Sequence, residues 1–191
     1  HRAAGVTDFL VFSNDCQDGT DALLDRLAAL GWVEHHDNPP PHDAQGVQFA
    51  ALNRAAGLPI ARAADWILPL DIDEFVNVHA GDRTLPSLIA ALPEATAITL
   101  TWRLFGNCGV VGYADRPVTE QFNRAAPEVI WWPWRAAMFK TLYRNDGTYA
   151  KPGVHRPRAP DPGRVAAARW FDGHGRELPE TFRTRRVFSD F

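Results

Sequence analysis

Three carboxylates stand within four positions at the end of a short apolar run. Asp71, Asp73 and Glu74 follow Leu70 directly. Like charges at this spacing repel one another, so they favour a partner that carries positive charge. In an extended chain alternate side chains point the same way, and we therefore expect Asp71 and Asp73 to face one point while Ile72 turns into the sheet. Two converging carboxylates suit Mg²⁺ or Mn²⁺, which keep positions open for phosphate oxygens.

The elements that must position these carboxylates alternate along the chain. Short apolar runs predict strands, and amphipathic stretches with capping residues such as Thr20 and Thr84 predict helices. Strands are predicted at Thr7 to Phe12, at Trp32 to His36, from Trp66 into the carboxylates and at Ala97 to Trp102, and helices at Asp21 to Leu30, Gln45 to Ala56 and Leu85 to Leu92. Such alternation predicts an α/β, Rossmann-like fold with a mainly parallel sheet and helices on both faces.

A second polar segment, residues 13–19, follows the first predicted strand. In open parallel sheets, ligands lie beyond the carboxyl ends of the strands. The 13–19 segment and the carboxylates at 71–74 should therefore meet around one ligand. The 13–19 segment can also be a turn that caps the following helix.

The remainder of the chain carries weaker patterns. From Phe105 to Trp134 the sequence predicts irregular structure beside the cleft, and the run from Trp131 to Trp134 could stack on sugars or pack in a core. Residues 151–191 carry 9 basic and 5 acidic side chains, against 11 and 18 in residues 1–150. This basic C-terminal extension predicts either a phosphate-gripping segment rich in Arg or a solvated tail, with 151–164 as a surface loop.

Length and composition predict one globular domain over residues 1–191, since 46% of the side chains are hydrophobic. The absence of a long apolar run or a signal pattern predicts a cytoplasmic protein without a transmembrane segment, and peripheral membrane association stays open. A pI near 6.2 without a recognition motif disfavours nucleic acid as a partner. Cys16 and Cys108 are predicted to be free thiols.

Three histidines lie close together in the sequence, at His35, His36 and His42. A strand followed by a proline-rich loop provides no evident ligand geometry for a metal. We therefore predict that these histidines lie on the surface.

Taken in order, several segments resemble the glycosyltransferase family 2-like enzymes of the GT-A fold, in the branch whose metal motif reads Asp-x-Asp-Glu-Phe. The resemblance covers roughly residues 1–155 and implies that a first strand and helix would precede His1. The matching segments are Ser13-Asn14-Asp15-x-x-Asp18-Gly19-Thr20, Trp66, Asp71-Ile72-Asp73-Glu74-Phe75, Trp102-Arg103-x-Phe105-Gly106, Thr119-Glu120-x-Phe122 and Lys140.

The resemblance implies a donor site for a nucleotide-sugar. Asn14, Asp15 and Asp18 would contact the nucleoside, Asp71 the ribose and the metal, and Asp73 the metal. The implied cofactor is a divalent cation, Mn²⁺ or Mg²⁺, which would stabilise the negative charge that develops on the departing diphosphate.

The resemblance also implies an acceptor side, with a sugar or glycan as the second partner in polysaccharide biosynthesis. An inverting transfer needs a carboxylate base for the acceptor hydroxyl. Glu120 is the first candidate and Glu74 the second, and Glu120 could instead pair with Arg103 or Arg124. His155 is a candidate late metal or diphosphate ligand. The acceptor would be bordered by Phe105, Gly106 and Asn107.

Two other functions stay open. A haloacid-dehalogenase-type phosphotransferase also places Asp-x-Asp after an apolar strand, with the first Asp as nucleophile, the second as acid and base, and a later Lys. In that class the motif usually lies on the first strand and is followed by Gly or Thr, whereas Glu74 and Phe75 follow it here. The other function is a non-catalytic module that binds a nucleotide or carbohydrate.

Overall fold

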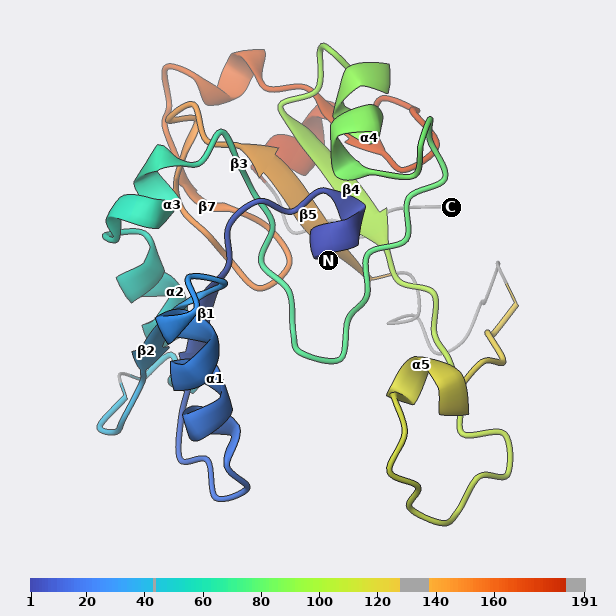
Figure 1. Ribbon diagram of the computed structural model, residues 1–191. Coiled ribbons are helices and arrows are strands. Elements are labelled where there is room, and N and C mark those ends of the chain that lie inside the picture. Colours follow the sequence, from blue (N-terminus) through green and yellow to red (C-terminus); the bar gives the residue numbers. More distant parts are fainter. Residues whose placement is uncertain (43, 128–137, 185–191) are drawn as a thin grey trace.

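The described part of the chain folds into short strands and helices of the mixed α/β class (Figure 1). This computed structural model describes residues 1–42, 44–127 and 138–184. The strands are β1 (Leu10–Ser13), β2 (Glu34–Asp37), β3 (Trp66–Ile67), β4 (Ala97–Thr101), β5 (Phe139–Arg144), β6 (Tyr149–Lys151), β7 (Arg158–Pro160) and β8 (Trp170–Asp172). The α-helices are α1 (Thr20–Ala29), α2 (Val47–Ala55), α3 (Pro59–Ala63), α4 (Leu85–Ala91) and α5 (Val118–Gln121), and the 3₁₀ helices are η1 (Arg2–Ala4), η3 (Val165–Ala167) and η4 (Glu180–Arg183).

The largest sheet has the strand order β3-β5-β4-β8 and is mixed. β5 runs antiparallel to both of its neighbours, β3 and β4, whereas β4 and β8 are parallel. A separate parallel pair, β1-β2, and an antiparallel pair, β6-β7, complete the strands of the described residues. The prediction of an α/β fold is confirmed, but the main sheet is not mainly parallel, because β5 enters between two strands of the opposite direction.

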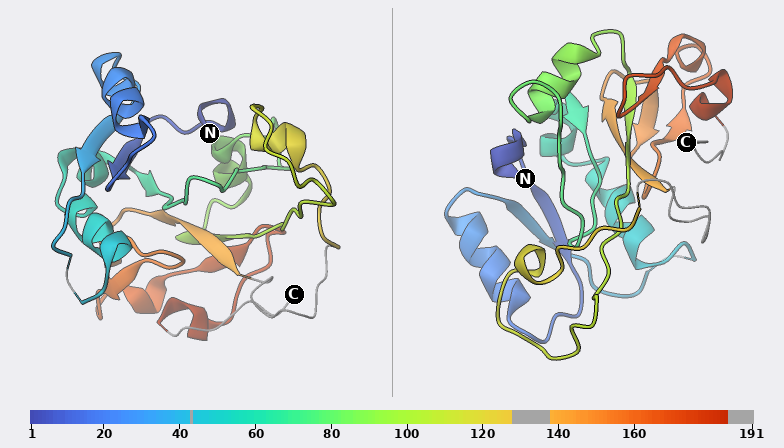
Figure 2. Two further views of the ribbon diagram at one scale, coloured as in Figure 1. Left: turned by 90° about the horizontal axis from the view of Figure 1, so that it is seen from below. Right: turned by 90° about the vertical axis from the view of Figure 1, so that its right-hand side faces the viewer.

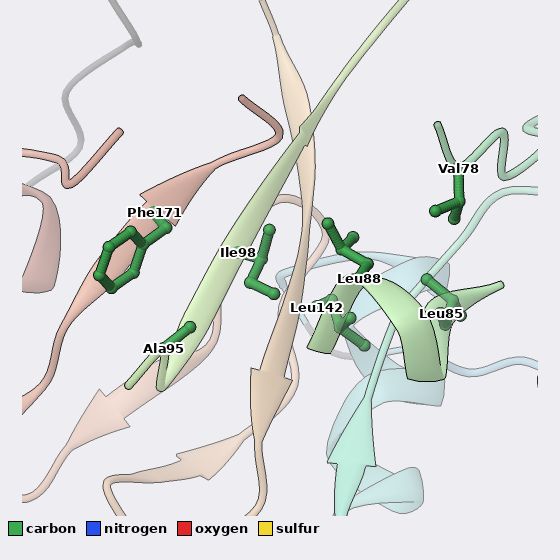
Figure 3. Close-up of a cluster of buried hydrophobic side chains, with 7 residues drawn as sticks. All are labelled: Val78, Leu85, Leu88, Ala95, Ile98, Leu142 and Phe171. Carbon is green, nitrogen blue, oxygen red and sulfur yellow. The ribbon is translucent and has the colours of Figure 1, made fainter. Parts of the chain in front are cut away.

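One face of the main sheet packs against α4 and the chain that leads into it. Ile98 from β4 and Leu142 from β5 meet Leu85 and Leu88 of α4, as Figure 3 shows. Thr84 caps this helix, since its Oγ1 accepts a hydrogen bond from Ser87 N at 3.4 Å. The segment 68–80, which joins β3 to α4, crosses the same face through Leu68, Val76 and Val78.

The opposite face holds an aromatic core. Phe139 and Tyr143 alternate with Lys140 and Leu142 along β5, so they point away from α4 and pack with Trp170 and Phe182. Trp170 Nε1 donates to the Tyr149 hydroxyl at 2.9 Å, which satisfies a buried polar pair. Burial raises the pKa of the Tyr143 phenol. η4 covers this face (Figure 2).

The basic segment after residue 150 contributes to this core, so within the described residues it is not the surface loop and solvated tail of one alternative, while its use in gripping phosphates stays a prediction. Arg156 lies over the rings of Phe139, Trp170 and Phe182, with its guanidinium carbon 4.6 Å from the centre of the Phe182 ring. Its Nη1 donates to Phe182 O at 2.6 Å. Burial lowers the pKa of this guanidinium to about 10. Residues 185–191 lie outside the described part of the chain.

Several predicted elements are present with shifted ends. The helices predicted at 21–30, 45–56 and 85–92 correspond to α1, α2 and α4, and the strand predicted at 97–102 is β4. Gly19, not Thr20, is the N-cap of α1. No helix in the described ranges has the length and apolar character needed to cross a membrane. The Trp131 to Trp134 run lies outside the described residues.

Candidate functional site

Lys140 is the cation that the carboxylates after β3 require. Its Nζ lies 2.8 Å from Asp71 Oδ2 and 3.3 Å from Glu74 Oε2. The Lys140 side chain is 3% exposed, so its ammonium group is held almost entirely by these partners. Strand alternation explains the position, because Lys140 shares a face of β5 with Leu142 and that face is crossed by segment 68–80.

Asp71 is held on both sides. One carboxylate oxygen accepts from Lys140, and the other, Oδ1, accepts from Gln48 Nε2 of α2 at 2.7 Å. Glu74 closes the turn from within, because its Oε2 also accepts from the backbone N–H of Asp71 at 2.9 Å. Asp71, Glu74, Lys140 and Gln48 form one connected group, which we call the Asp71 cluster.

Residues 71–74 form a turn and not a strand continuation. Glu74 N donates to Asp71 O at 3.1 Å, and β3 has already ended at Ile67. Ile72 is 97% exposed, so the expectation that its side chain turns into the sheet was wrong. The strand does not continue into residues 71–74 because Pro69 lacks the backbone N–H that a strand would pair. Ile72 therefore lies on a turn and not on a strand. Asp73 is exposed at the tip of this turn.

The charges around this turn do not cancel. Asp71 and Glu74 share one ammonium group, that of Lys140, and among the described residues Asp73 has no ion-pair partner. Asp73 is the carboxylate that none of these internal contacts occupies. The donor set therefore fits a divalent cation that arrives with its own phosphate ligands.

The predicted nucleoside loop follows β1 at the carboxyl end of that strand, but β1 and β3 belong to different sheets, so the prediction that this loop and residues 71–74 share one sheet edge was wrong. Asn14 and Asp15 are exposed, and Asp15 adopts a left-handed backbone with φ of 50°. Asp18 has a structural contact, because its Oδ1 accepts from Thr20 N at 3.0 Å at the start of α1. Its hydrogen bonds to Thr20 lower the pKa of Asp18.

His155 is not brought to the Asp71 cluster. Its Nδ1 donates to Phe139 O at 3.0 Å, and its ring lies edge-on to Trp102 with 5.4 Å between ring centres. Its carbonyl accepts from Thr141 Oγ1, whose side chain lies on the face of β5 opposite to Lys140. The three predicted metal ligands Asp71, Asp73 and His155 are therefore not preassembled in the structure.

The predicted acceptor residues and the first candidate base belong to an excursion between β4 and β5. Figure 1 shows α5, which carries Glu120, standing apart from the main sheet. Glu120 is exposed, and within the described ranges it forms no ion pair with Arg103 or Arg124. Phe105 bridges Ala125 across this excursion, Gly106 N donates to Arg124 O, and Asn107 Nδ2 donates to Val110 O.

A group of metal-type ligands that the sequence reasoning missed lies at the ends of β1 and β2. Asp21, His35 and Asp37 place one ligand atom each within 4.8 Å of one another. The side chain of His35 is 4% exposed, so the prediction of a surface histidine was wrong at this position. The signal that could have identified this group is the position of its residues on neighbouring elements. Asp37 ends β2 next to Ser13, which ends β1, and Asp21 lies in the first turn of α1, the helix that joins these strands.

Comparison of the chain with protein-family models, curated proteins and solved structures finds no match.

Proposed function

We propose that this chain is a metal-dependent glycosyltransferase domain of the GT-A type, which transfers a sugar from a nucleotide-sugar donor to an acceptor hydroxyl with inversion. The observation that carries the proposal is the Asp71 cluster, in which buried Lys140 fixes Asp71 and Glu74 and leaves Asp73 exposed with unmatched charge. The exposed polar loop after β1 supports it as a place for the nucleoside.

In this proposal each residue has a separate task. Lys140 and Gln48 orient Asp71, and Asp71 and Asp73 would hold Mn²⁺ or Mg²⁺ with the donor diphosphate. The bound cation would stabilise the charge that develops on the departing diphosphate. Asn14 and Asp15 would contact the nucleoside, beside the turn that Asp18 fixes.

The transfer itself is a displacement at the anomeric carbon. The acceptor oxygen forms a bond to that carbon, and the carbon–oxygen bond to the diphosphate breaks with its electron pair going to the diphosphate. The acceptor proton passes to a carboxylate, for which Glu120 is the better candidate, since Glu74 already accepts from Asp71 N and contacts Lys140. Phe105, Gly106 and Asn107 lie on the same excursion as Glu120 and would border the acceptor.

A turnover assay tests this function. The chain is incubated with UDP-sugars and GDP-sugars, Mn²⁺ and simple sugar acceptors, and released nucleoside diphosphate is measured. We expect release that needs Mn²⁺ and falls by about 10²-fold in Asp73→Asn. Asp8→Asn, an exposed carboxylate outside the Asp71 cluster, should leave release unchanged. Equal release by wild type and Asp73→Asn would refute the assignment of Asp73.

One contact favours a second candidate, a dehalogenase-type phosphotransferase. The 2.8 Å ion pair between Lys140 and Asp71 is the kind of contact that this class makes to its nucleophile. Asp71 would then attack a phosphorus atom and Asp73 would protonate the leaving oxygen. Release of phosphate from small phosphoesters, lost in Asp71→Asn, would favour this candidate over the glycosyltransferase.

A further inference from the structure

Two elements, α1 and β2, bring three metal-type ligands together beside the carboxyl end of β1. Asp21 comes from the first turn of α1, while His35 and Asp37 come from β2. The parallel register pairs Ser13 with Asp37, so the end of β1 lies beside the end of β2. None of these residues belongs to the Asp71 cluster.

His35 is oriented as a ligand by its neighbours. Its Nδ1 lies 2.8 Å from Asp25 Oδ1, and its Nε2 lies 2.8 Å from Ser13 Oγ and 4.0 Å from Asp37 Oδ1. A carboxylate on one ring nitrogen favours the proton there and leaves a lone pair on the other nitrogen, which is the arrangement of histidines that bind metals. The lone pair of Nε2 then points toward Ser13 and Asp37.

Asp21 supplies a second, independent observation. Its Oδ1 is inaccessible to solvent and has no hydrogen-bond partner among the described residues, although the carboxylate as a whole lies close enough to the Cys16 thiol to raise the pKa of that thiol. A buried carboxylate oxygen without a partner costs free energy, and a cation at this position would supply the missing contact.

We propose that Asp21, His35 and Asp37 bind one divalent transition-metal ion, with Zn²⁺ as the best fit. One imidazole nitrogen with two carboxylate oxygens is a mixed donor set that suits Zn²⁺, whereas Mg²⁺ and Ca²⁺ prefer oxygen ligands throughout. Water or a further ligand would complete the coordination.

The three ligand atoms must move slightly closer together to bind one ion. Ligands at about 2.1 Å from a tetrahedral metal lie about 3.4 Å from one another, and the three ligand atoms here lie within 4.8 Å. Asp37 can supply this movement, because its side chain is 79% exposed and stands at the end of β2. A bound ion would tie the start of α1 to the end of β2.

Isothermal titration of the chelator-treated chain with Zn²⁺ alone tests the site. We expect one ion per chain and at least 10-fold weaker binding in Asp37→Asn, which changes an exposed side chain and should leave the fold intact. Glu34→Gln, on the same strand but outside the ligand group, is the matched control and should bind as wild type does. A rise in melting temperature with Zn²⁺, absent in Asp37→Asn, is the second readout.

Asp73→Asn separates this site from the proposed donor site. It should retain Zn²⁺ binding with the wild-type stoichiometry and affinity. Failure of the wild-type chain to bind Zn²⁺, or equal affinity in wild type and Asp37→Asn, would overturn the proposal. Neither result bears on glycosyl transfer, which is measured separately with Mn²⁺ and a nucleotide-sugar.

Discussion

Lys140 determines how the acidic turn after β3 can be stable. An ammonium group that is 3% exposed is costly to bury unless charged partners surround it, and Asp71 and Glu74 supply two of them. In return, Lys140 offsets part of the repulsion among the carboxylates. The exposed carboxylate of Asp73 is then the one left to meet a ligand.

Lys140→Met should destabilise the chain by about 3 kcal/mol, because it leaves Asp71 and Glu74 without their cation. This value is at the low end of the range for removing one partner of a buried ion pair, since the side chain of Asp71 is 40% exposed and water can solvate its charge in part. Urea unfolding of both proteins measures the difference.

The double variant Lys140→Met with Asp71→Asn is the control for this prediction. Removing one of the two orphaned charges should restore part of the lost free energy of unfolding. A single variant as stable as wild type would show that the ion pair does not stabilise the turn.

At the scale of elements, helix starts and strand ends position the polar groups. α4 begins beside Asp82, whose Oδ1 accepts from Ser87 Oγ at 2.5 Å and from Thr84 Oγ1 at 2.6 Å. These hydrogen bonds, that of Ser87 first, lower the pKa of Asp82 below its ordinary value of 3.8. The ionised carboxylate therefore braces the turn that leads into the helix.

The contribution of Asp82 should depend on pH. Because its pKa is lower in the folded chain, the ionised form adds stability above the unfolded-state pKa of 3.8, and this stability is lost as pH falls through the folded-state value. Asp82→Asn should thus be less stable than wild type at pH 7, with a difference that shrinks as pH falls below about 4. Thermal unfolding at a series of pH values measures this difference in stability, with Asp115→Asn as control. A difference between wild type and Asp82→Asn that does not change with pH would contradict the role of the ionised Asp82 carboxylate.

The elements also show what sequence patterns can and cannot predict. α1 and α4 follow from apolar residues at helical spacing, and Leu85 and Leu88 do face the core. β5 (Phe139–Arg144) was missed, because it is buried on both faces and the consecutive polar residues Lys140 and Thr141 interrupt any alternation of polar and apolar residues. The neighbours of β5 in the sheet are set by pairing between residues far apart in the sequence, such as Thr101 and Phe139. A local pattern of polar and apolar residues does not encode such pairing.

Part of the candidate site could likewise be predicted from local sequence, and part depends on how the strands pair. The crowding of Asp71, Asp73 and Glu74 predicted that a cation must be near, which is a local property of charge. That the structure supplies Lys140, 69 positions away, depends on the sheet. His35 and Asp21 were missed for the same reason, since their meeting requires β1 and β2 to pair in parallel.

At the scale of the whole molecule, burial is uneven. The main sheet is covered on both faces, by α4 on one and by the aromatic core around Trp170 on the other. The β1-β2 pair is a separate two-stranded sheet that contacts α1, and apart from buried Ser13 its residues are half-buried or exposed (Figure 1). Two-stranded sheets are marginal without further packing, so stability should differ between the two regions.

Native-state hydrogen exchange should show this difference. Amides of β4 and β5 should exchange close to the rate of global unfolding, and amides of β1 and β2 should exchange at least about 10-fold faster through local opening. Mass spectrometry of peptides from each strand measures both. Equal protection of the two sheets would contradict the uneven burial described above.

Binding of a nucleotide-sugar, followed by calorimetry with and without Mn²⁺, tests whether the Asp71 cluster forms a donor site. UDP-sugars and GDP-sugars are titrated into wild type, Asp73→Asn and the Zn²⁺-site variant Asp37→Asn. We expect at least one of these donors to bind wild type and Asp37→Asn in a Mn²⁺-dependent manner, and Asp73→Asn to lose the Mn²⁺-dependent part. Mn²⁺-dependent binding that is unchanged in Asp73→Asn, or no binding by any of the three proteins, would contradict this assignment.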